Sequence, residues 1–167
     1  MILILTGPPA AGKNTVGALI AKRLQKCVVV DVDLLRAMVV QPHIAPWLGE
    51  EGMAQLRLGA KNACRLAQSF AAEGYAVVIL DVLTDETAAL YRSQLAAHTH
   101  QILLLLPTLE ESLERNQRRG QWLTDDEVRL LYEWQMALHD YDRKIDNSNI
   151  AASDLATELA TNMDSLN

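Results

Sequence analysis

The 167-residue sequence is poor in cysteine and in aromatic residues, and it has no excess of positive charge. Its two cysteines, Cys27 and Cys64, lack the spacing of metal ligands or of a disulfide framework, so we interpret both as buried free thiols. A net charge of −6 gives no electrostatic footprint for non-specific binding to nucleic acid, although a local basic patch is compatible with it. The composition therefore favours a small soluble substrate over nucleic acid.

Long apolar runs are also missing. The apolar run at the N-terminus ends before Gly7, which makes it too short for a signal peptide, and no basic region precedes it. No later stretch approaches the roughly 20 apolar residues that a membrane-spanning helix needs. We therefore expect a cytoplasmic protein that has no membrane partner.

The sequence does contain enough apolar residues for a sizeable core. They make up 50% of the chain, which at this length suits one well-buried α/β domain and is short for two. The chain shows no internal repeat, linker or low-complexity segment. We therefore expect residues 1–167 to form a single domain.

Short apolar runs alternate with amphipathic segments along the chain. The apolar runs are typical of strands buried on both faces and cover residues 2–5, 27–30, 76–80 and 102–106, with a short fifth strand near 144–146. The amphipathic segments cover residues 13–25, 51–72, 86–97, 109–118 and 125–139, and a last helix, capped by Ser153 or Asp154, runs toward Met163. This alternation predicts a five-stranded parallel sheet with helices on both faces.

A glycine-rich turn follows the first apolar run and leads into a helical segment. Glycines let the backbone fold so that successive N–H groups point inward, and the N-terminus of the helix adds its positive dipole end. A lysine at the start of that helix can reach the β- and γ-phosphates of a nucleotide. A plain turn is the alternative, but the order of strand, loop, lysine and helix predicts a phosphate-binding loop made of Gly7, Pro8, Pro9, Ala10, Ala11, Gly12, Lys13, Asn14 and Thr15.

One position departs from the usual pattern of such a loop. The motif Gly-x-x-x-x-Gly-Lys-Ser/Thr places a hydroxyl directly after the lysine, where it contacts Mg²⁺, but here Asn14 stands there and the hydroxyl follows at Thr15. Asn14 could bind Mg²⁺ through its side-chain oxygen, could hold a metal-bound water, or could leave the metal to Thr15 and to carboxylates further along the chain. The sequence leaves these three options open.

Carboxylates follow the second apolar run. In parallel sheets of this kind ligands bind beyond the carboxyl ends of the strands, so residues at those positions are candidate site residues. Asp31 and Asp33 would point the same way if the chain is still extended there. An aspartate within reach of a phosphoryl acceptor can align the acceptor hydroxyl and take its proton. The alternative is that Asp33 caps a helix that starts at Leu34.

The third apolar run ends in Asp81, where a carboxylate can order a water in the Mg²⁺ shell. The alternative for Asp81 is a solvated acid in a turn before Thr84. We predict that Asn14, Thr15 and Asp81 organise the metal. Asp81 also belongs, with the two aspartates after the second run, to the predicted substrate side of the site.

Together these residues resemble a known family. The loop, the pair Asp31 and Asp33, Arg36 and the strand that ends at Asp81 look like the small P-loop kinases related to chloramphenicol phosphotransferase, shikimate kinase and gluconate kinase. The end of the loop also resembles the Gly-Lys-Gly-Thr form of adenylate kinases. The resemblance implies a three-layer α/β/α P-loop NTPase fold, nucleoside-monophosphate-kinase-like, with a short lid.

The resemblance also implies roles on the acceptor side. The stretch Val32-Asp33-Leu34-Leu35 is similar to the chloramphenicol phosphotransferase pattern in which the aspartate is the substrate-facing base. The pair Asp33 and Arg36 is shared with polynucleotide 5′-kinases, which keeps that substrate class as an alternative. The implied helical substrate-binding region spans about residues 36–73, with Arg36, Trp47 and Arg57 as candidate residues. Trp47 could instead be a packing plug, and Arg57 a solvated helix arginine.

A basic segment completes the implied site. Arg115, Arg118 and Arg119 fall at i, i+3 and i+4 and so on one helix face. In the family such a segment is a lid that closes over ATP, here about residues 115–124, and we take Arg118 as catalytic and the other two as nucleotide ligands. The alternative is a salt-bridged helix end that is closed by Gly120.

Asn147 and Ser148 follow the last predicted strand, where related kinases pass the adenine, although the same residues also suit a turn. With ATP and Mg²⁺ as cofactors, the predicted activity is transfer of the γ-phosphoryl group to a hydroxyl of a small molecule, with Lys13, Asp33 and Arg118 as catalytic residues. The alternatives are a nucleotide or polynucleotide 5′-hydroxyl kinase and a nucleotide-dependent switch without an acceptor. We expect a monomer or a homodimer.

Overall fold

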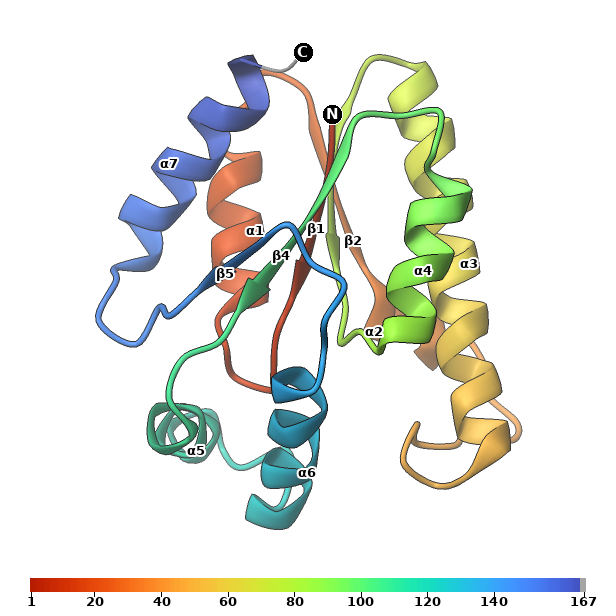
Figure 1. The fold of residues 1–167 in the computed structure, drawn as a ribbon, viewed down its shortest axis with the longest axis vertical. Coiled ribbons are helices and arrows are strands. Elements are labelled where there is room, and N and C mark those ends of the chain that lie inside the picture. Colours follow the sequence, from red (N-terminus) through yellow and green to blue (C-terminus); the bar gives the residue numbers. More distant parts are fainter. Residues whose placement is uncertain (166–167) are drawn as a thin grey trace.

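The strands form one parallel sheet at the centre of the structure. The computed structural model describes residues 1–165, and within them the strand order is β2-β3-β1-β4-β5 (Figure 1). Every pairing in this sheet is parallel, which confirms the predicted five-stranded parallel sheet. The strands are β1 (Ile2–Thr6), β2 (Cys27–Asp31), β3 (Ala76–Leu80), β4 (His100–Leu105) and β5 (Arg143–Ile145).

The central strand β1 lies between β3 and β4. Ile4 pairs with Ile79 on one side and with Ile102 on the other, and all three side chains are buried. Strands that are covered on both faces need apolar residues throughout, because neither face meets water. This explains the continuous apolar runs in the sequence.

Helices cover both faces of the sheet and make it the middle of three layers (Figure 1). Each face has its own apolar cluster, in which Ile20 and Tyr91 are among the fully buried side chains. The predicted α/β/α arrangement is therefore confirmed. The helices are α1 (Lys13–Ala21) and α7 (Ala152–Ser165) on one face, and α3 (Glu50–Ala72) and α4 (Asp85–Gln94) on the other.

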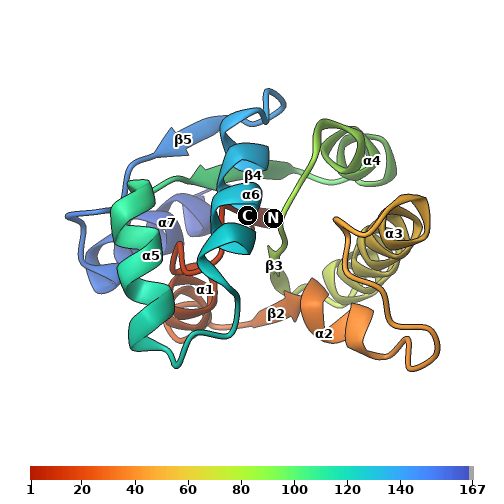
Figure 2. The same cartoon turned by 90° about the horizontal axis from the view of Figure 1, so that it is seen from below.

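Three further helices lie at the end of the molecule where the strands end. They are α2 (Val32–Ala37), α5 (Leu109–Arg118) and α6 (Asp125–Met136). Figure 2 looks onto this end and shows α2 and α5 on opposite sides of it, with α6 nearer the middle. None of the helices in the described part of the chain is long and apolar enough to cross a membrane.

Several element boundaries differ from the predicted ones by a few residues. Helix α1 ends at Ala21, because the chain must turn between it and β2, and β4 begins at His100, two residues earlier than predicted. Helix α6 ends at Met136 because the chain turns there toward β5. Helix α7 begins at Ala152, so Ser153 and Asp154 lie in its first turn and the predicted cap is wrong. Apolar periodicity marks where elements exist better than where they end.

Candidate functional site

The turn between β1 and α1 has the backbone of a phosphate-binding loop. Gly7 has a φ of 153°, and a Cβ there would lie 2.2 Å from the carbonyl oxygen of Leu105. Gly12 has a φ of 95° and comes directly before α1. No side chain caps the first turn of α1, so the amides at this positive helix end are available to an anion.

Lys13 folds back onto this loop. Its Nζ donates to the carbonyl oxygen of Gly7 at 2.6 Å and to that of Pro8 at 3.1 Å, and the side chain is buried. Burial lowers the pKa of Lys13 to about 8 because a buried ammonium loses its hydration. The two loop carbonyl oxygens therefore hold the ammonium at the loop.

Four other predicted site residues lie close enough to Lys13 to act on its charge. The carboxylates of Asp33, Asp81 and Asp31 favour the protonated form of Lys13 and so oppose the fall of its pKa. The guanidinium of Arg119 acts in the other direction. The fold thus brings together residues that are widely separated along the chain.

Asp31 is fixed from two sides at the end of β2. Its Oδ1 accepts a hydrogen bond from the backbone N–H of Asp33 at 3.0 Å, which caps α2, and its Oδ2 accepts one from Nδ2 of Asn14 at 2.8 Å. The prediction that both aspartates extend from a strand is wrong, because α2 begins directly after Asp31. The alternative that Asp33 is the helix cap is also wrong, since Asp31 has that role.

Asp33 is exposed and paired with an arginine. Nη1 of Arg36 lies 3.3 Å from Oδ1 of Asp33, whose side chain is 76% exposed. The Arg36 side chain lies against α3, where a Cβ on Gly59 would come within 2.9 Å of its Cγ. Asp33 therefore has an oriented carboxylate that is open to solvent, as a proton acceptor for a substrate needs.

Asp81 lies buried beyond the end of β3. Its Oδ2 accepts a hydrogen bond from the hydroxyl of Tyr91 at 2.8 Å, and its Oδ1 accepts one from the backbone N–H of Val82 at 2.8 Å. Burial raises the pKa of Asp81 to about 6, although both hydrogen bonds act against this shift. The alternative of a solvated turn acid is therefore wrong.

The three predicted lid arginines differ in their partners. Nε of Arg115 donates to Glu111 at 2.6 Å, and Nη2 of the exposed Arg118 donates to Glu114 at 2.6 Å. Arg119 forms no salt bridge with any residue that the structure describes, and its charge acts on the loop lysine. The alternative of a salt-bridged helix end thus describes Arg115 and Arg118 but not Arg119.

The turn after β5 lies against the phosphate loop. Nδ2 of Asn147 donates to the carbonyl oxygen of Ala11 at 2.8 Å. Nη2 of Arg115 donates to the carbonyl oxygens of Asn147 at 3.2 Å and Ser148 at 3.4 Å. The structure therefore places Asn147 and Ser148, which the sequence predicts to contact the nucleotide, beside the loop and the lid helix α5.

A family model described as "AAA domain" matches residues 2–132 of the chain. The chain belongs to this AAA domain family. No curated protein matches the chain. The matched residues run from β1 through most of α6, so they include the phosphate loop and the carboxylates around it.

Solved structures share the fold of this AAA domain protein over nearly its whole length. Shikimate kinase from Acinetobacter baumannii in complex with shikimate is 22% identical, with a TM-score of 0.65, and the match covers 99% of this chain and 93% of that chain. APS kinase from Mycobacterium tuberculosis in complex with AMPPNP and APS is 18% identical, with a TM-score of 0.71 and coverage of 98% and 96%. A gluconokinase from Sinorhizobium meliloti is 16% identical, with a TM-score of 0.67 and coverage of 98% and 91%. These likenesses confirm the predicted P-loop kinase fold.

The oxygen donors around the loop of the AAA domain protein suit Mg²⁺. Asn14, Thr15 and Asp81 offer amide, hydroxyl and carboxylate oxygens, which are the ligands of a hard cation. Residues 1–165 contain no group of three or more His, Cys, Asp and Glu side chains that could hold a metal by themselves. Proteins commonly bind Mg²⁺ through one or two carboxylates together with substrate phosphates, and Asp81 would supply such a carboxylate.

Arg57 and Trp47, both predicted for the acceptor pocket, have partners other than Asp33. Arg57 forms ion pairs with Glu50 and, at 3.4 Å, with Glu86, so it is not a simple solvated arginine. Trp47 is half-buried beside the buried Pro46. Within the described residues no hydrogen bond or ion pair joins Arg57 or Trp47 to Asp33.

Sequence reasoning missed several buried polar residues of the AAA domain protein, among them Thr6, Tyr91 and Gln135. Thr6 stands between an apolar run and the phosphate loop, and Tyr91 lies in an amphipathic segment, and in both places a single hydroxyl gives no separate signal. Gln135 does give a signal, because it falls seven residues after Val128 on the apolar face of α6. A glutamine at such a position indicates a buried hydrogen-bonding role.

Proposed function

We propose that this AAA domain protein is an ATP- and Mg²⁺-dependent kinase that transfers the γ-phosphoryl group to a hydroxyl of a small molecule. The observation that carries the proposal is that Asp33, an exposed carboxylate oriented by Arg36 at 3.3 Å, follows two residues after Asp31, whose Oδ2 accepts a hydrogen bond from Asn14 of the phosphate loop. A nucleotide-dependent switch has no need of an exposed carboxylate such as Asp33 beside its loop. Two of the similar structures, a shikimate kinase and an APS kinase, hold small molecules, shikimate and APS.

On the donor side, the loop amides and Lys13 hold the phosphates. Lys13 exchanges its hydrogen bonds to Gly7 and Pro8 for phosphate oxygens, which accept more strongly because they are charged. Bound Mg²⁺ neutralises charge on the phosphates, and Asn14, Thr15 and Asp81 are the residues that would hold it. The chain itself orients the phosphates and places the positive end of α1 beside them.

On the acceptor side, Asp33 takes the proton of the substrate hydroxyl. A bond forms between the acceptor oxygen and the γ-phosphorus, and the bond from that phosphorus to the β–γ bridging oxygen breaks, so that ADP leaves. The proton passes to a carboxylate oxygen of Asp33. Arg36, at 3.3 Å from Oδ1 of Asp33, orients this carboxylate.

For the lid, residues 115–124, the contacts favour Arg119 over Arg118 as the arginine that faces the transferring group. Arg118 is exposed and paired with Glu114, whereas the charge of Arg119 reaches Lys13. Arg115 supports the turn at Asn147 and so shapes the nucleotide side. A single domain, with an acceptor region over residues 36–73, remains part of the proposal.

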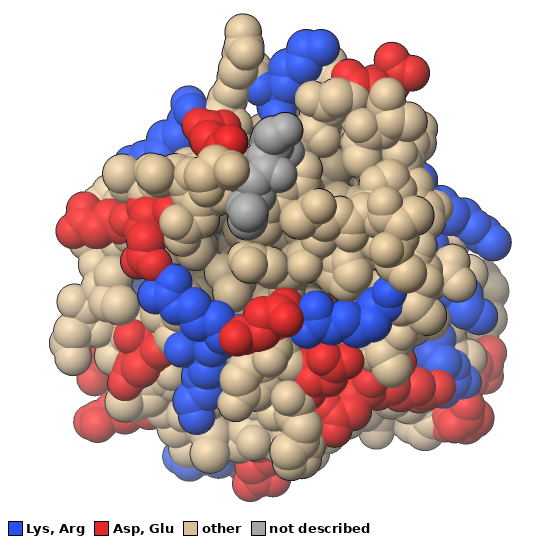
Figure 3. All heavy atoms as spheres, turned by 45° about the horizontal axis from the view of Figure 1, so that its top comes forward, with Lys and Arg blue, Asp and Glu red and all other residues tan. Residues whose placement is uncertain are grey.

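A polynucleotide 5′-hydroxyl kinase is less well supported. That function needs a basic groove around Arg36 and Arg57, but Arg36 is paired with Asp33 and Arg57 with Glu50 and Glu86. Figure 3 shows the end of the molecule where the strands begin, away from Arg36 and Arg57, and there too acidic and basic side chains are interspersed. Counterion release from a phosphate backbone requires unpaired cations, so a small-molecule acceptor is favoured.

Asp33→Asn tests the kinase proposal against a switch. The variant keeps the size of the side chain but cannot take a proton, so we expect near-normal ATP binding and a loss of phosphoryl transfer of about 10²-fold or more. The measurement is transfer of labelled γ-phosphate, with Lys13→Ala as the blank. A nucleotide response that is unchanged in Asp33→Asn, with no transfer in the wild type, supports the switch instead.

The acceptor is found by a screen with labelled ATP. Hydroxylated metabolites, aminoglycosides, nucleosides, chloramphenicol and 5′-hydroxyl oligonucleotides cover the classes that the sequence suggests. We expect a small molecule to be phosphorylated above the Lys13→Ala blank. Phosphorylation of the oligonucleotides alone would select the nucleic-acid alternative.

A further inference from the structure

Gln135 of α6 takes part in a closed set of buried hydrogen bonds. Its Oε1 accepts from the hydroxyl of Thr6 at 2.7 Å, and its Nε2 donates to the carbonyl oxygen of Leu83 at 2.7 Å. The backbone N–H of Leu83 donates to Oγ1 of Thr6 at 3.0 Å, which closes the set. Thr6, Leu83 and Gln135 are each 0% exposed, so water cannot replace any of these bonds.

The three residues belong to three separate parts of the proposed site. Thr6 is the last residue of β1 and directly precedes the phosphate loop. Leu83 follows Asp81 by two residues, in a segment that is also held by the hydrogen bond from Val82 to Asp81. Gln135 lies in α6, the helix that begins directly after the lid segment, residues 115–124. One amide group therefore joins the loop, the Asp81 segment and the helix behind the lid.

Filling space does not require a glutamine at this position. A methionine or leucine would occupy a buried position on the apolar face of α6 without any need for partners, whereas a buried amide is unfavourable unless its donor and acceptor are both satisfied. Gln135 has both a donor and an acceptor, and each is used on a different partner. Its chemistry thus matches the task of joining two segments.

We propose that Gln135 is a positioning residue for phosphoryl transfer. It acts through Thr6 and Leu83, keeps the Asp81 segment in place relative to the phosphate loop, and fastens α6 to both. The inference rests on the proposed function, in which Asp81 serves the Mg²⁺ side of the site. Loss of the amide should therefore impair the Mg²⁺-dependent part of the reaction more than nucleotide binding itself.

The test compares Gln135→Met with the wild type. Methionine keeps the length of the side chain and removes both hydrogen-bonding atoms. We measure the affinity for a non-hydrolysable ATP analogue with and without Mg²⁺ by calorimetry, and the rate of phosphoryl transfer. Without Mg²⁺ we expect the affinity of the variant to be close to that of the wild type. With Mg²⁺ we expect the variant to lose most of the gain in affinity that the wild type shows. The transfer rate should fall by about 10²-fold, because a small misplacement of a reacting group has an effect of that size.

Three further variants separate positioning from stability. Tyr132→Phe removes another hydrogen bond of α6, from the Tyr132 hydroxyl to the carbonyl oxygen of Pro107 at 3.0 Å, which does not lead to the loop. It should lower the melting temperature and leave the Mg²⁺-dependent gain unchanged. If Gln135→Met does not fold, Thr6→Val tests the same link and should lose the gain, while Thr6→Ser keeps the hydroxyl and should retain it.

The outcomes are distinct from those of the kinase proposal. A wild-type protein that binds the analogue more tightly with Mg²⁺ but phosphorylates no acceptor contradicts the proposed function, and the comparison of Mg²⁺-dependent gains still decides the role of Gln135. A folded Gln135→Met or Thr6→Val variant with a wild-type gain overturns the inference. In that case the hydrogen bonds serve only the stability of α6.

Discussion

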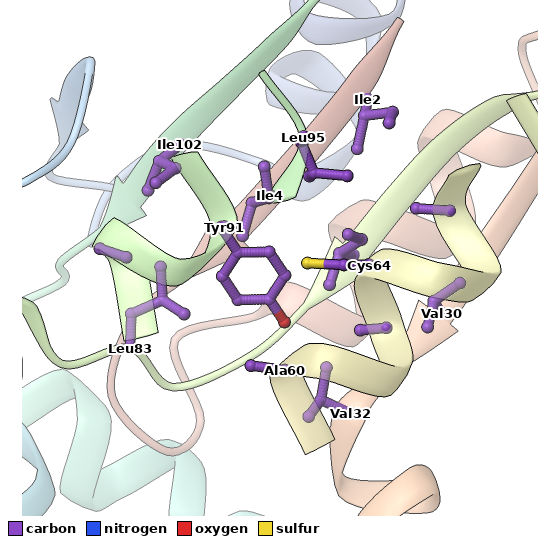
Figure 4. Close-up of a cluster of buried hydrophobic side chains, with 14 of the residues drawn as sticks. Ile2, Ile4, Val30, Val32, Ala60, Cys64, Leu83, Tyr91, Leu95 and Ile102 are labelled. Carbon is purple, nitrogen blue, oxygen red and sulfur yellow. The ribbon is translucent and has the colours of Figure 1, made fainter. Parts of the chain in front are cut away.

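The hydroxyl of Tyr91 donates a 2.8 Å hydrogen bond to Oδ2 of Asp81, although both side chains are buried. Figure 4 shows the Tyr91 ring among apolar side chains, with the hydroxyl pointing toward Ala60 of α3. Burial raises the pKa of Tyr91 well above its ordinary value, so the hydroxyl remains a donor throughout the neutral range. The apolar core therefore supplies a fixed donor to a carboxylate at the edge of the proposed site.

Tyr91→Phe should destabilise the protein in a pH-dependent way. It removes the donor to a buried carboxylate, and a hydrogen bond to a charged group contributes about 1.5–3 kcal/mol to the free energy of unfolding. The loss should be larger at pH 8 than at pH 5, because Asp81 is increasingly protonated below its pKa of about 6. Urea unfolding at the two pH values measures it. An equal loss at both would show that the charge of Asp81 does not change between pH 5 and pH 8, which contradicts a pKa of about 6.

Asp81→Asn should remove a pH dependence of stability. The folded-state pKa of about 6 lies above the ordinary value of 3.8, so between them the folded state binds more protons than the unfolded state. The stabilisation is fully present below about 4 and is lost as the pH rises through about 6. The stability of the variant relative to the wild type should therefore be more favourable at pH 8 than at pH 5, while phosphoryl transfer falls.

Asp85→Asn is the matched control for this experiment. Hydrogen bonds from the backbone N–H of His139 lower the pKa of Asp85, so its contribution is lost only as the pH falls through its lowered pKa, on the acid side of 3.8. The imidazole of His139 lies 3.1 Å from Oδ2 of Asp85 and pairs with it as an ion only when protonated, so the control is made in a His139→Gln background. In that background the effect of Asp85→Asn on stability should be constant between pH 5 and pH 8. Melting temperatures that shift in parallel for both variants would contradict the burial of a charged Asp81.

Local patterns in the sequence were sufficient for the loop and the sheet, but long-range partners were not predictable. Lys13 and the glycines around it have a fixed spacing, and the apolar runs mark the strands. The partner of Asn14, by contrast, is Asp31, which depends on where β2 ends and α2 begins. Gln135 and Thr6 are 129 residues apart and meet only because α6 packs beyond the end of β1. No local periodicity encodes such a meeting.

ATP binding should take up protons above pH 8. The pKa of Lys13 is lowered to about 8 in the free protein, so the ammonium is increasingly deprotonated above that pH, and bound phosphates should restore the proton. The affinity for an ATP analogue should fall as the pH rises from 8 to 9.5. Calorimetry in two buffers of different ionisation enthalpy measures the uptake, and Lys13→Met should show none of it.

Substitution shows whether Asn14 serves the metal, directly or through a water, or leaves it to other residues. Asn14→Ser restores the hydroxyl that usually follows the lysine, and it should retain the gain in nucleotide affinity that Mg²⁺ gives. Asn14→Leu removes the side-chain oxygen and the hydrogen bond to Asp31 of 2.8 Å, and it should lose most of that gain. An unchanged gain in Asn14→Leu would assign the metal to Thr15 and Asp81. Asn14→Leu also breaks the hydrogen bond to Asp31, the residue that caps α2. Asp31→Asn keeps a good helix cap and therefore controls for damage to α2.

Arg119→Ala should impair transfer far more than Arg118→Ala. Arg118 is two-thirds exposed and paired with Glu114 at 2.6 Å on the same helix, and an exposed pair of this kind contributes at most about 1 kcal/mol, so the effect should stay within about fivefold. Arg119 has no such partner among the described residues, and its charge reaches the loop lysine. Loss of one donor to a developing charge costs about 10²-fold or more in turnover.

Single-turnover transfer at saturating ATP measures this difference without the contribution of nucleotide affinity. Arg119→Lys keeps the charge but not the planar fork of donors, so it should recover only part of the rate. Equal rates for Arg118→Ala and Arg119→Ala would contradict the assignment of the catalytic role to Arg119. A larger loss in Arg118→Ala would instead return the catalytic role to Arg118, because its pair with Glu114 would then have to open when ATP binds.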